Sequence, residues 1–526
     1  MTCETKTNRV VNTGPTPPSV PWSDHTYQII DRWTMVLLVA AVSWRLIRFA
    51  LKMPMWGDEA MLDLNIMHRS LGGMLRPLGF GQVAPPLFLI GEWLMQHGLG
   101  NSEYVLRIGP LLAGMASCFI FWRWSRMLLS PLGTLVAVGF FALGYYPVRH
   151  CVEVKPYAFD ELAALALYFL GTAWILQPQR TRYLWIAAIV TPLLLGFSYP
   201  SVFVAGGLCA AVAVELIKNR RWANFAAGFL LAAATVGGFL LVLKLAGAGQ
   251  YQRTGAHMRA YWHHSFPPGN PLHFLIWLIR IHTGNLFAYP VGGKRGGSTA
   301  TFLVFLVGLA VFIRYRRKLL MLLLTPFVLT FIAALMRRYP YGGSARVAQH
   351  LAPVICLLAG AGIAWLVEKF LRIEAQHRLA THIAGGLLLT VAIIGALRDV
   401  LHPYKTVADE KTRSIVVHVL RQAGDSGGLV VLQPKKTVQV NFQLYLRWYG
   451  GQSVHWNGQE ATSWAGRSGN RRVVLNFNPL LAPSLLLAKV AKDGPWQITG
   501  QKTWHVQVLP IQQGPTFCQV LYLRRR

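Results

Sequence analysis

Eleven long apolar segments constrain the fold of this chain more than any other feature of its sequence. Each approaches the roughly 20 residues that an α-helix needs to cross the hydrocarbon core of a bilayer. The segments lie at residues 33–51, 105–122, 131–148, 158–177, 183–199, 201–217, 222–247, 300–313, 319–336, 347–367 and 379–397. Hydrophobic residues make up 53% of the chain and charged residues 13%, which a soluble domain could not solvate. The sequence therefore predicts an α-helical polytopic membrane protein with about 11 transmembrane helices.

A shorter apolar run, residues 84–96, is interpreted as an interfacial or re-entrant helix in the first outer loop. It begins with Pro85 and Pro86 after a single alanine, and it carries Glu92. A run of this length is too short for an ordinary span. Counting it as a span would reverse the sidedness of everything that follows it.

The positive-inside rule supports this interpretation, because short cytoplasmic connections collect Lys and Arg near span ends. With a cytoplasmic N-terminus, every second connection carries such a cluster. The clusters contain Arg123 and Arg126; Arg180 and Arg182; Lys218, Arg220 and Arg221; Arg314, Arg316, Arg317 and Lys318; Lys369 and Arg372. The same topology places residues 52–104, 149–157, 248–299, 337–346 and the tail from about 398 on the outer face.

Composition divides the chain into three parts. Residues 1–32 are polar, rich in proline and without the apolar core of a signal peptide, so we expect a disordered cytoplasmic arm. Residues 33–398 form the transmembrane module. Residues 399–526 are expected to form a small extracytoplasmic α/β domain, with a helix at 484–494. Its predicted strands are 429–434, 471–478, 504–510 and 516–523.

The formal net charge is +31, from 51 basic and 20 acidic residues. The basic residues are dispersed through membrane loops rather than gathered on one soluble face, so we expect no nucleic-acid partner. Those in the predicted outer loops either contact anionic membrane lipids or form a phosphate site. The chain has no Walker loop and no HExxH motif, so nucleotide use and zinc-protease chemistry have no support.

Five motifs follow one another in a fixed order. They are MWGDEA (55–60), APPLFLIGEWL (84–94), SEYVLRIGP (102–110), HCVEVKPYAFDEL (150–162) and RRYPYGGSARVAQHLAP (337–353). This order resembles the C-type-fold membrane glycosyltransferases that use polyprenyl-phosphate sugars, the family of the protein O-mannosyltransferases and the lipid A aminoarabinose transferase. The resemblance covers roughly residues 30–400. Weaker similarity continues in the tail, in HPYKTVADEKTRSIVVHVL (402–420) and NFQLYLRWYG (441–450).

The resemblance implies a role for the acidic pair Asp58 and Glu59, which follows the first apolar segment. Transfer from such a donor needs a carboxylate to take the proton of an acceptor hydroxyl, cations to hold the phosphate and an apolar groove for the lipid chain. By resemblance Asp58 is the base, with inversion at the anomeric carbon, and Glu59 positions the acceptor or contacts a metal. The alternative for the pair is a helix N-terminal cap, a position that acids favour.

The loop HCVEVKPYAFDEL places Glu153, Lys155 and Tyr157 at alternating positions, on one face of an extended segment. By resemblance these residues lie near the active-site cavity. Lys155 suits phosphate binding as a point charge, and Glu153 would bind a metal or orient Lys155. A plain salt bridge between Glu153 and Lys155 is the alternative.

The chain departs from close relatives of the lipid A enzyme just before the prolines of the interfacial helix. Those relatives carry an acid and a lysine there, whereas this chain has Gln82, Val83 and Ala84. The expected metal carboxylate is therefore missing, so the sequence leaves the need for a divalent metal ion open. Gln82 can still hydrogen-bond a phosphate or a sugar, and Arg69, next to His68, is a candidate for compensating the missing lysine.

The late loop RRYPYGGSAR is the second candidate for phosphate binding. Glycines let backbone amides approach an anion, and arginines can hold it through two hydrogen bonds. The alternative is a tight turn whose arginines contact lipid headgroups. The candidates in this loop are Arg337, Arg338, Tyr339 and Arg346.

The sequence thus predicts an inverting glycosyltransferase that moves a sugar from a polyprenyl-phosphate donor to a hydroxyl of a lipid, glycan or protein. The expected location is the outer face of a bacterial-type inner membrane. Two alternatives come from other classes: a transporter or lipid flippase, and a non-catalytic scaffold for envelope assembly. A transporter would favour internal repeats and charges inside its spans, but the sequence shows no repeat and few such charges. A scaffold would not need Asp58 and Glu59.

Overall fold

The computed structural model describes most of the chain and separates it into two compact units. The described residues are 22–219, 224–292, 296–371, 373–423, 427–432, 445, 448–449, 463–465, 471–476, 496–507 and 515–525. The first unit runs to Ala50 and then from Arg69 to Val400, and the second joins Leu51–His68 to the chain from Leu401 onward. The segment that carries Asp58 and Glu59 therefore belongs with the tail, although the sequence analysis assigned it to the transmembrane module.

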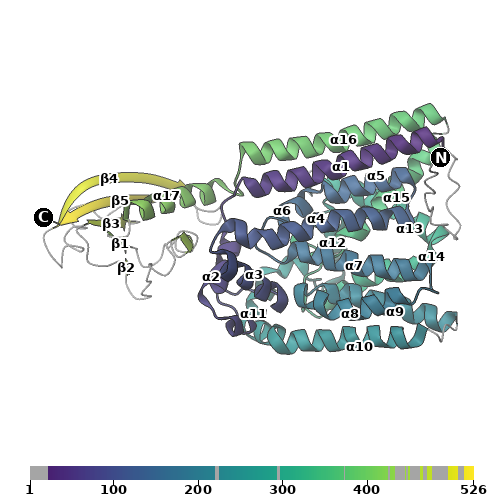
Figure 1. Cartoon of the computed structure of the whole chain (residues 1–526), viewed down its shortest axis with the longest axis horizontal. Helices are drawn as coiled ribbons and strands as arrows, with labels where there is room; N and C mark the ends of the chain where they lie inside the picture. Colours follow the sequence, from purple (N-terminus) through teal and green to yellow (C-terminus); the bar gives the residue numbers. More distant parts are fainter. Residues whose placement is uncertain are drawn as a thin grey trace, which may run out of the picture. The chain divides into compact units, whose positions relative to one another are not determined.

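The first unit is a bundle of helices (Figure 1). Its helices are α1 (Asp24–Ala50), α3 (Pro86–Leu99), α4 (Glu103–Leu128), α5 (Pro131–Ala142), α6 (Tyr145–His150), α7 (Tyr157–Leu176), α8 (Arg182–Phe197), α9 (Ser201–Lys218), α10 (Phe225–Val242), α11 (Ala248–Tyr261), α12 (Pro271–His282), α13 (Gly297–Tyr315), α14 (Arg317–Leu335), α15 (Ala352–Phe370) and α16 (Glu374–Leu401).

Each of the eleven predicted segments contains an apolar helix, which confirms the predicted polytopic helical fold. Among the described residues, nine helical stretches are long and apolar enough to cross a membrane. The other two segments form the shorter helices α5 and α8. Helix α3 has 14 residues and α5 only 12, so length does not separate α3 from the shorter spans, and its interpretation as an interfacial helix stays a prediction.

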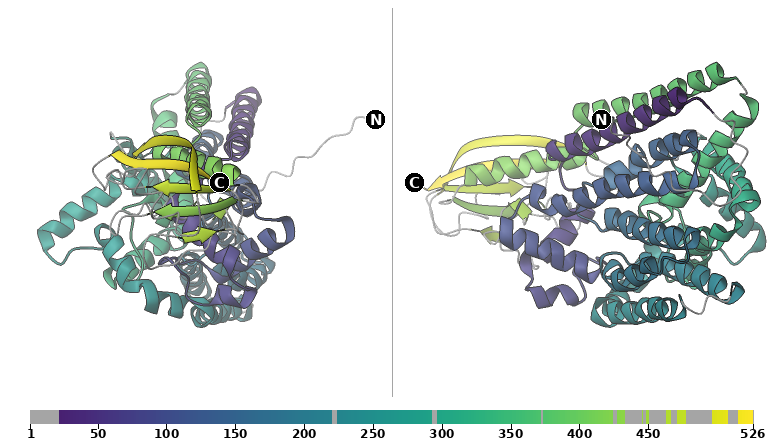
Figure 2. Two further views of the ribbon diagram at one scale, coloured as in Figure 1. Left: turned by 90° about the vertical axis from the view of Figure 1, so that its left-hand side faces the viewer. Right: turned by 45° about the vertical axis from the view of Figure 1, so that its right-hand side comes forward.

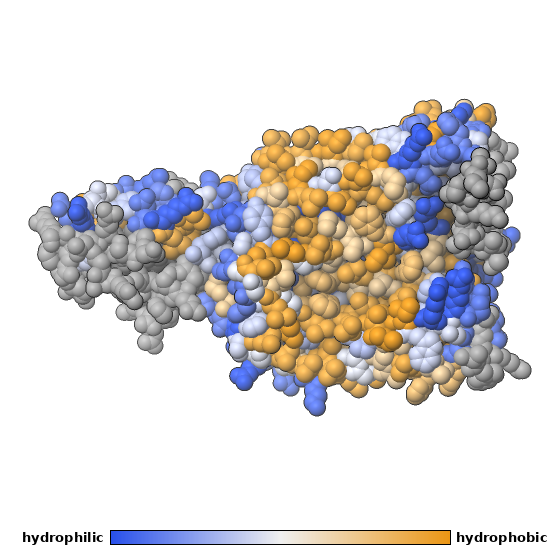
Figure 3. Space-filling view, in the orientation of Figure 1, coloured by the Kyte–Doolittle hydropathy of each residue, from blue (hydrophilic) through white to orange (hydrophobic). Residues whose placement is uncertain are grey.

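Hydrophobic side chains cover the flank of the helices between their ends (Figure 3). Hydrophilic side chains gather at the end of the bundle where α1 begins (Figures 1 and 3). This distribution is the one that an integral membrane protein requires, because apolar side chains are stable against hydrocarbon and polar ones are not. The chain is accordingly an integral membrane protein.

Small residues and polar contacts hold the helices together. Helices α13 and α15 lie so close that a Cβ on Gly308 would overlap the carbonyl of Leu358, so glycine is required at this crossing. Helices α1 and α16 lie side by side (Figures 1 and 2). Their contact includes a buried ion pair in which Arg48 Nη1 lies 2.5 Å from Asp399 Oδ1.

The predicted outer loop 248–299 begins differently from the sequence expectation. Helix α10 does not end with the apolar run but continues through a π-helical turn, Leu243–Gly247, into α11. The change from apolar to polar residues at 248 does not end the helix, because the polar segment that follows has no proline before Pro267. Helix α11 thereby carries Gln250 to the candidate site.

The second unit is an α/β domain. It contains α2 (Gly57–His68), α17 (Val407–Ala423) and a sheet of β1 (Gly427–Leu432), β2 (Ser463–Ala465), β3 (Arg471–Asn476), β4 (Trp496–Gln507) and β5 (Pro515–Arg525). The strand order is β2-β1-β3-β5-β4, with β1 and β3 parallel and the other pairs antiparallel. Helix α17 packs against the sheet (Figure 2).

The predicted strands 429–434, 471–478 and 516–523 correspond to β1, β3 and β5. The fourth, 504–510, covers only the end of β4, which already begins at Trp496. The polar residues of ITGQKT hide the first half of this strand from a hydrophobic pattern, although they pair with β5. The predicted helix 484–494 and residues 1–21 of the predicted disordered arm lie outside the described residues. Residues 24–32 of that arm are not disordered but form the beginning of α1.

Candidate active site

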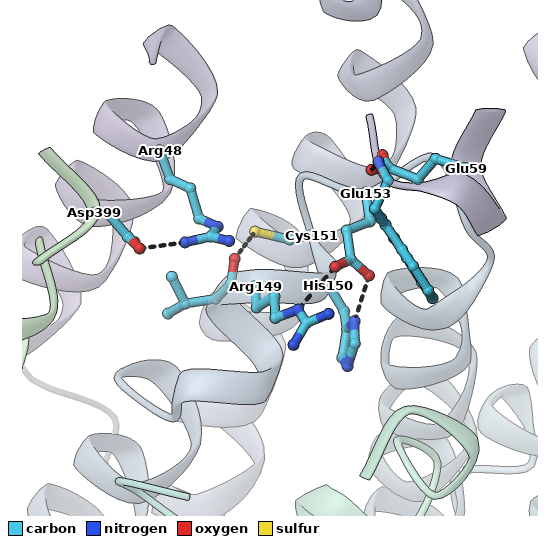
Figure 4. A network of polar contacts seen from close by, with 9 residues as sticks. Arg48, Glu59, Arg149, His150, Cys151, Glu153 and Asp399 are labelled. Atoms are coloured by element: carbon cyan, nitrogen blue, oxygen red, sulfur yellow. Dashed lines mark hydrogen bonds and ion pairs between the residues drawn. The ribbon is translucent and has the colours of Figure 1, made fainter. Parts of the chain in front are cut away.

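Glu153 is the centre of a buried cluster in the loop between α6 and α7. Its Oε1 accepts a hydrogen bond of 2.8 Å from Nε of Arg149, and its Oε2 lies 2.8 Å from Nδ1 of His150 (Figure 4). Helix α6 positions both partners, since Arg149 and His150 form its last turn and Glu153 follows four and three residues later. The sequence analysis paired Glu153 with neither residue, although the spacing of Arg149 and Glu153 could have indicated the pair.

Burial and the Glu153 carboxylate set the charges of this cluster. Burial alone would lower the pKa of Arg149, but the adjacent Glu153 and Tyr145 together outweigh burial and raise this pKa above its usual value. Burial lowers the pKa of His150 to about 4, and Glu153 offsets only part of this effect. His150 is therefore neutral at pH 7, with Nδ1 donating to Glu153. Its buried Nε2 has no hydrogen-bond partner within the described part of the chain.

The charge of His150 predicts a specific loss of stability in acid. An unfolded histidine titrates near 6.5, so between pH 6.5 and about 4 the unfolded chain binds more protons than the folded one. Stability should fall as the pH drops through this window, by at most about 3 kcal/mol from this group. Thermal melts of detergent-solubilised protein should show a larger drop from pH 7 to pH 4.5 for the wild type than for His150→Gln. Parallel curves would show that His150 does not contribute.

Lys155 and Gln82 form a second buried contact in the same region. Lys155 Nζ donates a 2.6 Å hydrogen bond to Oε1 of Gln82, and the two residues are 5% and 7% exposed. The glutamine thus occupies the expected place of an acid, with an acceptor oxygen but no negative charge of its own. The amide oxygen of Gln82 carries no formal charge, so this contact by itself does not neutralise the ammonium group of Lys155.

The loop that carries Glu153 and Lys155 is not extended, so the predicted common face is wrong. Residues 151–156 form turns and bends. The backbone N–H of Lys155 donates a 2.7 Å hydrogen bond to the carbonyl of Glu153, which is a three-residue turn. The proline at 156 and the start of α7 at Tyr157 tighten this segment. Glu153 and Lys155 are nevertheless both buried.

Gln250 and Tyr199 hold the segment around Gln82 in place, and the sequence analysis missed both. Gln250 is fully buried, and its Oε1 and Nε2 bind the backbone N–H and carbonyl of Ala84 at 3.2 and 3.0 Å. The Tyr199 hydroxyl donates to the same carbonyl at 3.0 Å. The side-chain amide of Gln250 thus pairs with the backbone N–H and carbonyl of Ala84, as a neighbouring β-strand would. These two hydrogen bonds fix the segment before α3 to α11.

The late loop contributes Tyr339 and Arg346 to the region of His150. The Tyr339 hydroxyl donates a 2.9 Å hydrogen bond to the carbonyl of Val347, and burial raises its pKa, with a smaller contribution from the nearby Asp160 and Tyr157. The guanidinium of Arg346 is near enough to lower the pKa of His150 slightly. The ring of Tyr157 lies 4.9 Å from that of His150.

Arginines of the predicted set contact tyrosine side chains and backbone carbonyls. Arg346 donates to the Tyr261 hydroxyl at 2.7 Å, and Arg338 lies over the ring of Tyr251 at 4.7 Å. Arg337 and Arg338 are exposed. Arg69 donates to the carbonyls of Gly73 and Pro77 at 3.3 and 3.0 Å, so these contacts support its own loop.

In the second unit, Glu59 has a structural role at the start of α2. The helix begins at Gly57, and Oε2 of Glu59 accepts a 3.3 Å hydrogen bond from the backbone N–H of Trp56. This is the geometry of a capping box, in which the third helical residue reaches back to the cap. Glu59 is 1% exposed, whereas Asp58 is half-buried in the first turn. The capping role that was the alternative for the pair is therefore met by Glu59.

The tail motifs hold the segment that carries Asp58. The Tyr445 hydroxyl donates to the carbonyl of Met55, and Arg413 donates a 2.7 Å hydrogen bond to the carbonyl of Lys52. Burial raises the pKa of Tyr445, and the nearby Asp409, Tyr449 and Glu59 add to this effect. Described residues from three of the motifs that carried the family resemblance, among them Met55, Arg413 and Tyr445, thus lie in one unit.

Removal of the Tyr445 hydroxyl should loosen this segment. We expect Tyr445→Phe to lower kcat about five- to tenfold with little change in the KM of the donor, because one buried hydrogen bond of about 1 kcal/mol is lost near Asp58. Steady-state kinetics would show this split, with Tyr449→Phe as the matched control. An unchanged kcat for a folded Tyr445→Phe protein would show that the contact only stabilises the tail.

Comparison with known proteins places this geometry in a known fold. No protein-family model matches the chain, and no curated protein matches its sequence significantly. The crystal structure of ArnT from Cupriavidus metallidurans in the apo state matches 93% of this chain and 98% of ArnT, with a TM-score of 0.51 and 10% identity. The chain has the ArnT fold. The predicted C-type glycosyltransferase fold is thereby confirmed.

Two further solved structures match less closely than the apo form of ArnT. ArnT bound to undecaprenyl phosphate covers the same shares of both chains, with a TM-score of 0.48 and 11% identity. The Archaeoglobus fulgidus oligosaccharyltransferase AglB, in complex with an inhibitory peptide and a dolichol-phosphate, is 13% identical and has a TM-score of 0.44. That match covers 74% of this chain and 58% of AglB.

The described residues of this ArnT fold do not fit a metal centre. No three side chains among the described His, Cys, Asp and Glu residues are grouped so that they could hold an ion. Glu153 uses its two carboxylate oxygens on Arg149 and His150, and Gln82 replaces the expected acid. The side-chain oxygen of Gln82 accepts a hydrogen bond from Lys155 and is not placed as a ligand of a metal ion. We therefore derive no chemical step through a metal.

Proposed function

We propose that this protein is an inverting glycosyltransferase that moves a sugar from a polyprenyl-phosphate donor to a hydroxyl acceptor on the outer face of the inner membrane. The observation that carries the proposal is the division of roles at the start of α2. Because Glu59 caps the helix, the half-buried Asp58 beside it is not needed as the cap. The ArnT fold provides the setting, and ArnT has been crystallised with undecaprenyl phosphate.

In the proposed reaction the acceptor hydroxyl attacks the anomeric carbon from the face opposite the phosphate. The carboxylate of Asp58 takes the proton of the hydroxyl as the new glycosidic bond forms. The bond between the anomeric carbon and the phosphate oxygen breaks, and both of its electrons leave with the polyprenyl phosphate. One displacement of this kind inverts the anomeric configuration.

The buried polar residues of the first unit suit the phosphate of such a donor. Lys155 would bind the phosphate as it gains charge, while Gln82 fixes the ammonium group. Glu153 holds Arg149 in place, and Arg346 lies close to His150, so this region contains two guanidinium groups that could contact an anion. Tyr157 and Tyr339 would bind sugar hydroxyls. These binding residues are compatible with a lipid, a glycan or a protein as the acceptor.

A transfer assay tests the proposal. Purified protein would be incubated with a panel of polyprenyl-phosphate sugars that carry a radiolabel, together with membrane extract as the source of acceptors. We expect the label to move from the donor to a new product with at least one sugar, and heat-denatured protein to give none. Failure with every donor and extract would favour the scaffold alternative.

A further inference from the structure

A cavity of about 220 Å³ lies at the end of the first unit where α1 begins. It is surrounded by the start of α1, the turns α4–α5 and α13–α14, the end of α15 and the start of α16. The lining residues that matter here are Trp22, Ser130, Arg316, Trp365, Glu368 and His377. None of the candidate active-site residues lines this cavity, so it is a separate site. Hydrophilic side chains are concentrated at this end of the helices (Figure 3).

Glu368 gives the cavity a fixed acidic group. Its Oε1 accepts a 2.7 Å hydrogen bond from Oγ of Ser130, which also caps α5 by accepting from the N–H of Gly133. Within the described ranges no ion pair joins Glu368 to a cation. The neighbouring Lys369 instead lies over the ring of Trp365, with Nζ 4.8 Å from its centre. The carboxyl group is therefore oriented by a neutral hydroxyl and can accept an ammonium group.

Arg316 and His377 give the same cavity donors for an anion. Arg316 joins α13 to α14 and is 8% exposed. His377 is fully buried, and in the described part of the chain neither of its ring nitrogens has a hydrogen-bond partner. Its ring lies against Trp22, with the ring centres 3.9 Å apart. A buried polar ring without partners is unfavourable unless a bound molecule satisfies it.

We propose that this cavity binds the headgroup of a membrane lipid that carries both a phosphate and a primary ammonium group, as phosphatidylethanolamine does. Arg316 and His377 bind the phosphate, and Glu368 binds the ammonium group. An acid and a base in one cavity match a zwitterion, whereas a purely anionic headgroup would be repelled by Glu368. Trp22 and Trp365 suit the boundary between headgroups and acyl chains, where tryptophan is enriched.

Competition between headgroups tests the proposal directly. Delipidated full-length protein would be mixed with equal amounts of phosphatidylethanolamine, phosphatidylcholine and phosphatidylglycerol of the same acyl composition, and bound lipid counted by native mass spectrometry. We expect roughly tenfold more phosphatidylethanolamine than phosphatidylcholine, because the quaternary amine of choline cannot donate a charge-assisted hydrogen bond to Glu368. Phosphatidylglycerol should also be bound less.

Variants distinguish the cavity from other lipid contacts. Glu368→Gln should remove the preference for ethanolamine over choline, and Arg316→Gln should lower retention of all three lipids. Glu215→Gln is the matched control for the acid, since Glu215 is 6% exposed on α9 and does not line the cavity. The exposed Arg314, also outside the lining, gives the control Arg314→Gln.

Three results would overturn the proposal. They are equal retention of ethanolamine and choline lipids by the wild type, a preference for phosphatidylglycerol, and an ethanolamine preference that persists in a folded Glu368→Gln protein. If Glu368→Gln does not fold, Ser130→Ala replaces it, because loss of the Ser130 hydrogen bond frees the carboxyl group without removing it. Ser130→Ala should then weaken the preference, and an unchanged preference would contradict the proposal.

Discussion

Asp58→Asn is expected to lower turnover by at least ~100-fold, the low end of the contribution of a general base. Asparagine keeps the size of aspartate and its preference for the first turn of a helix, but it cannot take the proton of the acceptor hydroxyl. Folding and donor binding should stay close to those of the wild type. Single-turnover transfer kinetics, a thermal melt and a donor-binding isotherm measure these three quantities separately.

Glu59→Gln is the matched control for this substitution. Glutamine retains an oxygen that can accept from the backbone N–H of Trp56, so the cap of α2 persists and turnover should change little. If Glu59→Gln lost activity while a folded Asp58→Asn protein turned over normally, the base would be Glu59. If Asp58, Glu59 and Glu153 all proved dispensable, the enzyme interpretation would give way to the scaffold.

Lys155→Met is expected to raise the apparent KM for the polyprenyl donor at least tenfold, with a smaller effect on the KM for the acceptor. Methionine retains most of the packing of the buried lysine stem but removes the ammonium group that would bind the phosphate. A charge-assisted hydrogen bond contributes roughly 1.5–3 kcal/mol, and about 1.4 kcal/mol corresponds to a factor of ten. Steady-state kinetics with each substrate varied in turn measures the two constants.

Arg338→Met serves as the control, because the sequence gives Arg338 the same candidate role but the structure places it on the surface against Tyr251. Its effect on the donor KM should be less than about twofold, as expected for an exposed charge. Donor affinity that falls equally in both variants would show that general surface charge binds the lipid phosphate. Wild-type affinity in Lys155→Met would remove Lys155 from the site.

Local patterns predicted the helices well but not the contacts that build the site. A run of apolar residues specifies a membrane helix wherever it stands, so all eleven segments could be located. By contrast, the bonds of Gln250 to Ala84 and of Tyr445 to Met55 join residues that are 166 and 390 positions apart. No periodicity records such a pairing, because it arises only when the helices pack.

Two local features were also misjudged, for different reasons. Alternation in EVKPY suggested an extended segment, but Pro156 and the start of α7 bend it into turns. For the acidic pair, the capping alternative has the helix begin after Asp58, whereas α2 begins at Gly57 and Glu59 makes the capping bond. Helix ends depend on a few hydrogen bonds, so a small shift of the helix start exchanges the roles of neighbouring residues.

The configuration of the product at the anomeric carbon tests the central claim most directly. The donor identified in the transfer assay would be prepared with a known anomeric configuration and labelled with ¹³C at the anomeric carbon, and the product of the purified enzyme would be analysed by NMR. A single displacement assisted by Asp58 predicts a product of inverted configuration, formed by the wild type and nearly absent with Asp58→Asn. A product of retained configuration, or equal product from both proteins, would contradict the proposed mechanism.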